Sequence, residues 1–119
     1  MPLDSTNWPQ PVGVGIDETT ALLMRARGFL ERGWCKGVLA VNANKQMVNP
    51  CSKQAVAWCA GGALFAAGVL PLLGIPHHPA FDRLMEAMGG ESIARFNNRQ
   101  ETVEPVIAAF DRAIEMGGQ

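Results

Sequence analysis

Apolar residues recur every three or four positions in two stretches of the chain, which is the spacing of amphipathic helices. The first stretch begins after Asp17, a residue that can cap a helix, and ends at Gly33, a typical helix terminator. The last stretch begins after Thr102 and tolerates Pro105 because that proline falls in its first turn. Its apolar stripe is the clearest in the chain and consists of Val103, Val106, Ile107, Phe110, Ala113 and Ile114.

A third stretch is apolar on every side. Ser52 can cap a helix that continues to about Val69, and after Gln54 every residue of it is apolar or glycine. A helix that is apolar all round is buried, so we expect it to be the central element of the fold. The pair Gly61 and Gly62 predicts a close backbone contact, either within the chain or across a homo-oligomer.

Shorter elements are expected between these helices. Residues 37–48 place apolar segments on either side of turn residues at 42–45, which predicts a small β-hairpin. Pro79 fits the first position of a short helix that the glycines at 89–90 would close. Residues 92–96 fit either a helical turn or a strand, and the polar residues that follow predict a turn.

Together these elements predict a mainly α fold with a minor β part. It contains about four helices around a buried central helix, with one small β-hairpin. Residues 17–117 are long enough for a single globular helical domain, whereas residues 1–16 show no sustained period and are expected to form an extended arm.

Charge and composition exclude several classes of protein. The chain has 10 Lys and Arg against 11 Asp and Glu, a net charge of -1, which argues against nonspecific nucleic-acid binding and against attraction to anionic membranes. The longest apolar run is broken by glycines and Pro71, so no transmembrane helix is predicted. Neither a secretory signal nor an even number of cysteines is present, and we expect a cytoplasmic protein with reduced thiols.

Cys59, His78 and Asn97 supply the residue types of a thiol hydrolase, namely a nucleophile, a base and an orienting amide. In the expected central helix, however, Cys59 lies two turns beyond the cap, where the effect of the helix dipole has faded. It is then better interpreted as a small buried apolar residue. A thiol-dependent hydrolase is therefore the alternative function; the sequence leaves open whether the chain is an enzyme and favours binding without catalysis.

No metal site or cofactor is predicted. The cysteines Cys35, Cys51 and Cys59 are too far apart in the sequence to form the close ligand pairs of structural zinc. The adjacent histidines His77 and His78 precede a proline in a loop, where exposed imidazoles are common. The glycines match neither the dinucleotide-binding nor the phosphate-binding loop motif.

Polar side chains gather around Phe96, just before the last helix. Arginine offers planar donors for carboxylate or phosphate groups, and Trp34 adds an aromatic face for a flat ligand. We therefore expect a site that binds a small anionic or nucleotide-like ligand, or a protein partner, without catalysis. Its residues are Trp34, Arg95, Asn97, Asn98 and Arg99.

Three motifs together resemble an uncharacterised family of small proteins from bacteria, actinobacteria among them, and bacteriophages. They are Gly33-Trp34-x-x-Gly37, Trp58-Cys59-x-x-Gly62-Ala63-Leu64, and Phe96-Asn97-Asn98 ahead of the last helix. The family, a domain of unknown function, has Trp-Asn-Asp at the third motif, so the resemblance implies no activity that depends on that Asp. It implies a bacterial, phage or prophage accessory protein, placed in the host cytoplasm if phage-encoded. A structural virion or assembly component is the second alternative.

Overall fold

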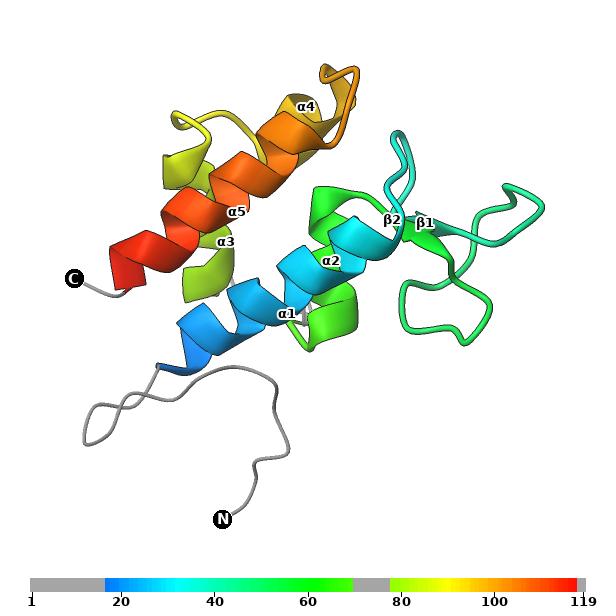
Figure 1. The fold of residues 1–119 in the computed structure, drawn as a ribbon, viewed down its shortest axis with the longest axis horizontal. Helices are drawn as coiled ribbons and strands as arrows, with labels where there is room; N and C mark the ends of the chain where they lie inside the picture. The colour runs from blue at the N-terminus through cyan, green and yellow to red at the C-terminus, as the bar shows by residue number, and fades with distance from the viewer. Residues whose placement is uncertain (1–16, 70–77, 118–119) are drawn as a thin grey trace, which may run out of the picture.

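The computed structural model describes residues 17–69 and 78–117. Within them the fold is mainly helical, as predicted, with five helices and one short two-stranded antiparallel sheet. Figure 1 shows α1 crossing in front of α2, with α5 and α3 beside them. In chain order the elements are α1 (Glu18–Arg32), β1 (Ala40–Val41), β2 (Ala57–Trp58), α2 (Ala60–Ala67), α3 (Pro79–Ala87), α4 (Ile93–Asn98) and α5 (Glu104–Gly117).

The helix α1 forms where the sequence predicts it. One carboxylate oxygen of Asp17 accepts a hydrogen bond from the Thr20 N–H at 2.7 Å, and the other accepts one from the Thr20 hydroxyl at 2.9 Å. These bonds, the backbone one first, hold the pKa of Asp17 below its ordinary value. The buried side of α1 includes Leu23 and Leu30 and packs against α2, α3 and α5. The helix α1 therefore contacts each of the other three long helices.

The last helix also follows its predicted stripe. Val106, Phe110 and Ala113 of α5 are fully buried, and α5 packs against α1 and α3. Pro79 is the first residue of α3, and Gly89 and Gly90 beyond its end both have positive φ, as the sequence predicts for a helix that stops there. Across residues 17–69 and 78–117, no helix is long and apolar enough to cross a membrane.

The predicted long central helix from Ser52 to Val69 is wrong in its first half. Residues 50–54 form turns, in which the N–H of Ala55 bonds the Ser52 carbonyl oxygen at 3.1 Å. Trp58 then lies in a strand, with its indole N–H bonded to the Pro50 carbonyl oxygen at 2.9 Å. The buried central helix is α2 alone. The backbone of Ala57 and Trp58 pairs with β1 as a strand and therefore does not form part of the helix.

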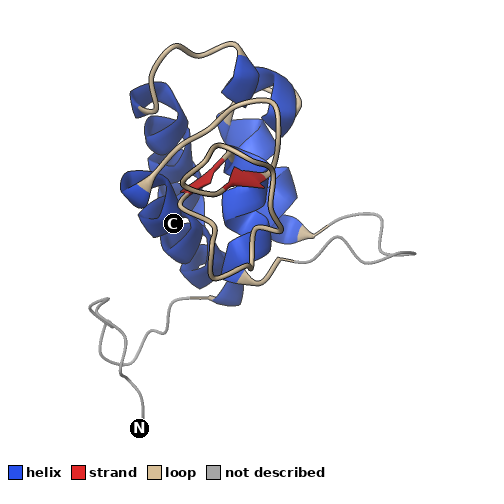
Figure 2. Ribbon diagram, turned by 90° about the vertical axis from the view of Figure 1, so that its right-hand side faces the viewer, coloured by secondary structure: helices blue, strands red, loops and turns tan. Residues whose placement is uncertain are grey.

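The predicted hairpin at residues 37–48 is present: the Asn42 N–H bonds the Gln46 carbonyl oxygen at 2.9 Å, and the Val48 N–H bonds the Ala40 carbonyl oxygen at 3.0 Å. Val41 forms an antiparallel bridge with Met47, and the N–H of Lys45 bonds the Asn42 carbonyl oxygen at 2.9 Å. The two-residue ladder, however, joins β1 to β2, with Ala40 opposite Trp58. Trp34 adds a parallel bridge on the other side of Trp58. Figure 2 shows these strands and their loops in front of the helices, at one end of the fold. We call residues 33–58 the ribbon.

The segment after α3 forms a helix rather than a strand. Ser92 caps α4, its hydroxyl oxygen accepting the Arg95 N–H at 3.1 Å. The helix extends through Asn98, so Asn97 lies within it and is buried instead of closing an exposed turn. This helix carries most of the polar residues that the sequence assigns to a site.

Candidate functional site

Asn97 ties separate segments of the chain together. Its side-chain oxygen accepts hydrogen bonds from the indole N–H of Trp34 at 2.8 Å and from the backbone N–H of Ala60 at 3.0 Å. Its amide nitrogen donates to the Cys35 carbonyl oxygen at 3.2 Å and to Oδ1 of Asn98 at 3.1 Å. The residue is 0% exposed, and its hydrogen-bonding capacity is filled. Asn97 therefore joins α4 to the ribbon and to the start of α2.

Asn98 holds the next part of the ribbon. Its Oδ1 accepts the backbone N–H of Gly37 at 3.0 Å, and Gly37 has a φ of 86°, a conformation that glycine adopts without strain. Its Nδ2 makes no hydrogen bond to any residue that the structure describes. This amide is the free donor at the edge of a small cavity.

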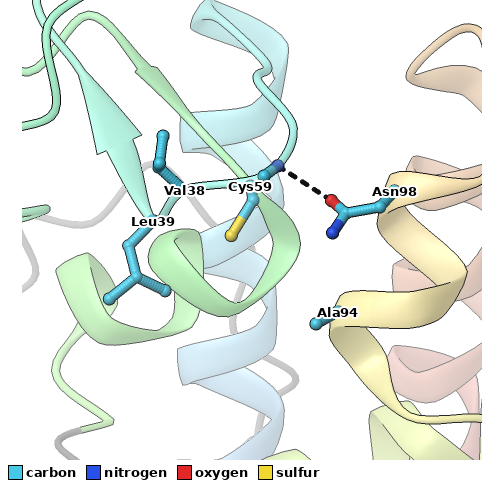
Figure 3. A pocket seen from close by; sticks show the side chains of 6 residues that line it. Val38, Leu39, Cys59, Ala94 and Asn98 are labelled. Carbon is cyan, nitrogen blue, oxygen red and sulfur yellow. Dashed lines mark hydrogen bonds between the residues drawn. The ribbon is translucent and has the colours of Figure 1, made fainter.

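That cavity, of about 150 Å³, opens between α4 and the start of α2. Figure 3 shows Leu39 and Cys59 on one side of it and Ala94 and Asn98 on the other. Its walls are apolar apart from one thiol and one amide, and its volume suits a molecule about the size of benzene. We call it the cysteine cavity; its lining is Gly37, Val38, Leu39, Cys59, Ala94 and Asn98.

Cys59 stands at the very start of α2, so the expectation that it lies two turns inside a helix is wrong. It is the N-cap residue, and its sulfur accepts the N–H of Gly62 at 3.3 Å. Burial nevertheless raises the pKa of the Cys59 thiol, and the backbone hydrogen bonds from Gly62 and Gly61 oppose that rise. Cys59 therefore has the position of an activated cysteine at a helix end without its lowered pKa.

Cys35 is the second thiol in this region. Burial, and to a smaller extent the repulsion between two neighbouring thiolates at Cys35 and Cys59, raises the pKa of Cys35 to about 11. Its thiol donates to the Val38 carbonyl oxygen at 3.6 Å. Both thiols are therefore protonated at neutral pH, and neither is a ready nucleophile.

The structure does not assemble Cys59, His78 and Asn97 into a hydrolase site. His78 caps α3, where its Nδ1 accepts the N–H of Ala80 at 3.0 Å. Asn97 bonds neither the thiol nor the imidazole. Within residues 17–69 and 78–117, no group of three or more potential ligands could hold a metal ion, and His77 lies outside these residues.

Maleimide labelling of the native protein at neutral pH should modify Cys51 first. Cys51 is exposed, whereas Cys59 is buried and Cys35 is half-buried with a pKa of about 11. Because the thiolate is the reacting form, labelling of Cys35 should accelerate as the pH rises towards that value. Timed labelling followed by peptide mapping in a mass spectrometer measures all three rates.

The control for this labelling is Cys51→Ser, which should leave the folded protein uniformly slow to react. If Cys59 reacted at neutral pH as fast as Cys51 or faster, the protonated state assigned to its thiol would be wrong. That outcome would favour the thiol hydrolase.

A larger hollow of about 550 Å³ lies on the ribbon, and we call it the ribbon hollow. Of the residues that the structure describes, Lys36 and Lys45 are the charged ones in its walls, and no carboxylate lines it. The ammonium group of Lys36 lies 5.8 Å from the centre of the Trp34 ring and donates to the Gln100 carbonyl oxygen at 2.7 Å. The lining is Trp34, Cys35, Lys36, Val38, Val41, Asn42, Ala43, Lys45, Val56 and Ala57.

The two arginines expected in the site lie apart from both cavities. Arg99 forms two hydrogen bonds of 2.9 Å with the carboxylate of Glu91, and its guanidinium lies 4.9 Å from the Phe96 ring centre. This pairing lowers the pKa of Glu91 and raises that of Arg99. Arg95 is exposed on α4. The structure thus brings together Trp34 and the two asparagines, while neither arginine lines the cysteine cavity or the hollow on the ribbon.

Sequence reasoning identified Trp34 but missed Lys36 and Lys45 as residues of one hollow. A signal was present, because no Asp or Glu occurs between Glu31 and Asp82. The spacing of these lysines along the chain does not indicate that Lys36 and Lys45 line one hollow, which follows only from the folded ribbon.

The Gly61–Gly62 pair has a role within the chain. A Cβ on Gly62 would overlap the carbonyl oxygen of Leu39, so the ribbon backbone lies directly on the first turn of α2. A Cβ on Gly61 would only reach ordinary contact, 3.8 Å from the Leu39 side chain. Gly62 is thus required for the close contact that forms one wall of the cysteine cavity, and homo-oligomer formation through this pair stays a prediction.

Comparison with protein families gave one finding that covers most of the chain. The model of the family of unknown function DUF6197 matches residues 16–116. Comparison with curated proteins and with solved structures gave no significant match. The resemblance that the sequence motifs indicate is confirmed, and the chain belongs to the family of unknown function DUF6197.

Proposed function

We propose that this protein is a non-catalytic binding module that captures a small anionic ligand with a flat or apolar body in the ribbon hollow. The observation that carries the proposal is the charge of the lining. Lys36 and Lys45 face a hollow without any carboxylate, in a chain whose net charge is -1. Fixed positive charge in an otherwise neutral protein favours an anion at that place.

The shape of the hollow supports a ligand with an apolar body. Val38, Val41 and Ala57 contribute aliphatic surface, and Trp34 contributes an aromatic ring. A volume of about 550 Å³ falls within the range of small-molecule sites. Such sites combine an apolar lining with a few polar groups that set orientation, as the two lysines and Asn42 would do.

Preorganisation of Trp34 also supports binding. Its indole N–H is fixed by the buried Asn97 at 2.8 Å, so the ring needs no ordering when a ligand arrives, which reduces the cost of association. Asn97 and Asn98 act in this proposal as positioning residues. Arg95 and Arg99 take no part in it, because neither lines the hollow.

The chemistry of the lining favours binding over catalysis. Cys35 is the nucleophilic group in these walls, and its pKa of about 11 keeps it protonated. Among the residues that the structure describes, neither a carboxylate nor an imidazole lines the hollow to act as a general base.

Titration with adenosine monophosphate, followed by backbone amide shifts in nuclear magnetic resonance spectra, tests this proposal. Adenosine and inorganic phosphate serve as the ring without the charge and the charge without the ring. We expect saturable shifts around Trp34 and Val41 with the nucleotide, and binding weaker by about tenfold or more, or 1.4 kcal/mol, with either part alone.

The matched variants are Lys36→Gln with Lys45→Gln, and Lys53→Gln as the control. Lys53 lies on the ribbon but does not line the hollow, so its substitution should leave nucleotide binding unchanged. Equal binding by the wild type and the double variant, or shifts centred on α4 and Arg99, would refute the assignment of the ligand to the ribbon hollow.

A further inference from the structure

The cysteine cavity takes no part in the proposed function. Of its lining residues, Cys59 is only 7% exposed, whereas Leu39 is 44% exposed and Ala94 is exposed on α4. Cys59 therefore forms the floor of the cavity, and Leu39 and Ala94 stand at its rim. A large apolar side chain that is nearly half exposed beside a cavity offers apolar surface that a bound molecule would remove from water.

The walls of the cavity are fixed by contacts within the chain. On the α4 side, Oδ1 of Asn98 accepts the Gly37 N–H at 3.0 Å. On the α2 side, the Cys59 N–H bonds the Leu39 carbonyl oxygen at 3.1 Å, and the missing side chain of Gly62 lets that carbonyl lie against the helix. The cavity is therefore formed before a ligand arrives, which lowers the cost of ordering it on binding.

The polar side chains at the cavity offer hydrogen-bond donors. Oδ1 of Asn98 accepts two hydrogen bonds, one from a backbone N–H and one from the neighbouring amide, and these fix the orientation of its own amide. Its Nδ2 bonds no residue that the structure describes, and in Figure 3 this nitrogen points into the space between Cys59 and Ala94. The sulfur of Cys59 accepts the Gly62 N–H at 3.3 Å, so its S–H remains as a weak donor.

The lining carries no charge among the residues that the structure describes. A carboxylate or phosphate group in this cavity would lose its hydration without a cation to compensate, whereas a neutral oxygen can accept a hydrogen bond from the Asn98 amide. Small-molecule sites combine an apolar lining with a few polar groups that set orientation. The ligand that fits is therefore small, neutral and mostly apolar, with one acceptor oxygen.

We propose that the cysteine cavity binds a small neutral carbonyl compound, such as a ketone or a lactone, of about the size of benzene. Its oxygen accepts a hydrogen bond from Nδ2 of Asn98, and its apolar body lies against Cys59 and Leu39. Binding is noncovalent, because the thiol of Cys59 is protonated at neutral pH. The ligand class differs from that of the ribbon hollow, and of the described lining residues only Val38 belongs to both sites.

Titration with cyclohexanone, followed by nuclear magnetic resonance spectra of the full-length protein, tests the proposal. Toluene serves as an apolar body of similar size without the oxygen, and pivalate as a similar body that carries a charge. We expect saturable shifts with cyclohexanone at the Gly37 amide and at the side-chain amide of Asn98. Pivalate should bind more weakly than cyclohexanone by about tenfold or more.

Asn98→Asp tests the hydrogen bond to the ligand. Aspartate keeps an oxygen to accept the Gly37 N–H but has no N–H to donate. Affinity for cyclohexanone relative to that for toluene should therefore fall by about tenfold in this variant. The ratio of the two affinities removes any effect that the variant has on the shape of the cavity.

Ala94→Leu tests the location of the ligand. The added side chain fills the cavity from its exposed rim, so binding of cyclohexanone and of toluene should both be lost. Arg95→Leu, at an exposed neighbouring position of α4 that does not line the cavity, is the matched control and should bind both probes as the wild type does. The double variant Lys36→Gln with Lys45→Gln should also keep cyclohexanone binding, which separates this site from the ribbon hollow.

Each of four results would overturn the proposal. An unchanged affinity ratio in Asn98→Asp would remove the carbonyl oxygen as the group that is recognised. Equal cyclohexanone binding by Ala94→Leu and the wild type would place the ligand elsewhere. The absence of saturable cyclohexanone shifts up to its solubility limit would leave the cavity to water, and tighter binding of pivalate than of cyclohexanone would make the ligand an anion.

Discussion

Gly62→Ala should lower the free energy of unfolding by about 3 kcal/mol, because a Cβ there has no space. The added carbon would overlap the Leu39 carbonyl oxygen and lie 3.2 Å from the Leu39 Cα. Both obstacles are backbone atoms, so relief requires the ribbon to move away from α2. Thermal unfolding should shift down by roughly 4 °C for each kcal/mol lost, and calorimetry or circular dichroism measures it.

Gly61→Ala is the matched control, one residue away in the same helix turn. Its Cβ would lie 3.8 Å from the Leu39 side chain and 4.0 Å from the Cys59 sulfur, which are ordinary contacts. Alanine is favoured over glycine in a helix by up to about 1 kcal/mol, so this variant should be as stable as the wild type or slightly more. Equal destabilisation of both variants would contradict the close contact described for Gly62.

Asn97→Ala should destabilise the protein by about 4 kcal/mol, because it removes the hydrogen-bond partner that several buried groups share and leaves them unsatisfied. The Trp34 indole N–H, the Ala60 N–H and the Cys35 carbonyl oxygen would all lose their bonds to the side chain. Each unsatisfied buried polar group costs about 1–3 kcal/mol. Chemical denaturation with urea gives the free-energy difference directly.

The effect on the ribbon hollow separates the role of Asn97 from general destabilisation. Under conditions where the Asn97→Ala variant is still folded, nucleotide binding should weaken, since the Trp34 ring is no longer fixed. Asn44→Ala, at an exposed position of the ribbon turn, serves as the control and should change stability by no more than about 0.5 kcal/mol. A loss for Asn97→Ala no larger than that of this control would exclude the proposed linkage.

The helices with local signals were predictable from the sequence. Asp17 before α1 and Pro79 at the start of α3 act through their own backbone neighbours. The stripe of α5 repeats at a period that is fixed by helix geometry alone. These features depend on residues a few positions apart, which a sequence displays directly.

The start of α2 was not predictable in this way. Every residue from Ala55 onward suits a buried helix, yet β2 takes the first of them because Ala40 and Val41 are available to pair with it. The chain between β1 and β2 must close a loop before that pairing contributes anything. No local sequence pattern indicates that β1 and β2 pair. The position of Cys59 at the start of α2 depends on that pairing.

Some residues of the candidate site were also predictable from the sequence, and others were not. The sequence placed Trp34, Asn97 and Asn98 among its candidates from residue type alone, and they do meet in the structure. It grouped Arg99 with them because of proximity along the chain, whereas the structure pairs that arginine with Glu91. Lys45 comes to line the same hollow as Trp34 and Lys36 only through the fold of the ribbon.

The amino-acid sequence by itself determined the class of fold, the family, and the positions of α1, α3 and α5, since these rest on composition and on contacts between near neighbours. Tertiary structure decided where α2 begins, which thiol caps it, and which charges surround the ribbon hollow. The physical reason is that β pairing, burial of Asn97 and the close approach of Gly62 to Leu39 join residues far apart in the chain. Their free energies depend on distances that only the folded chain defines.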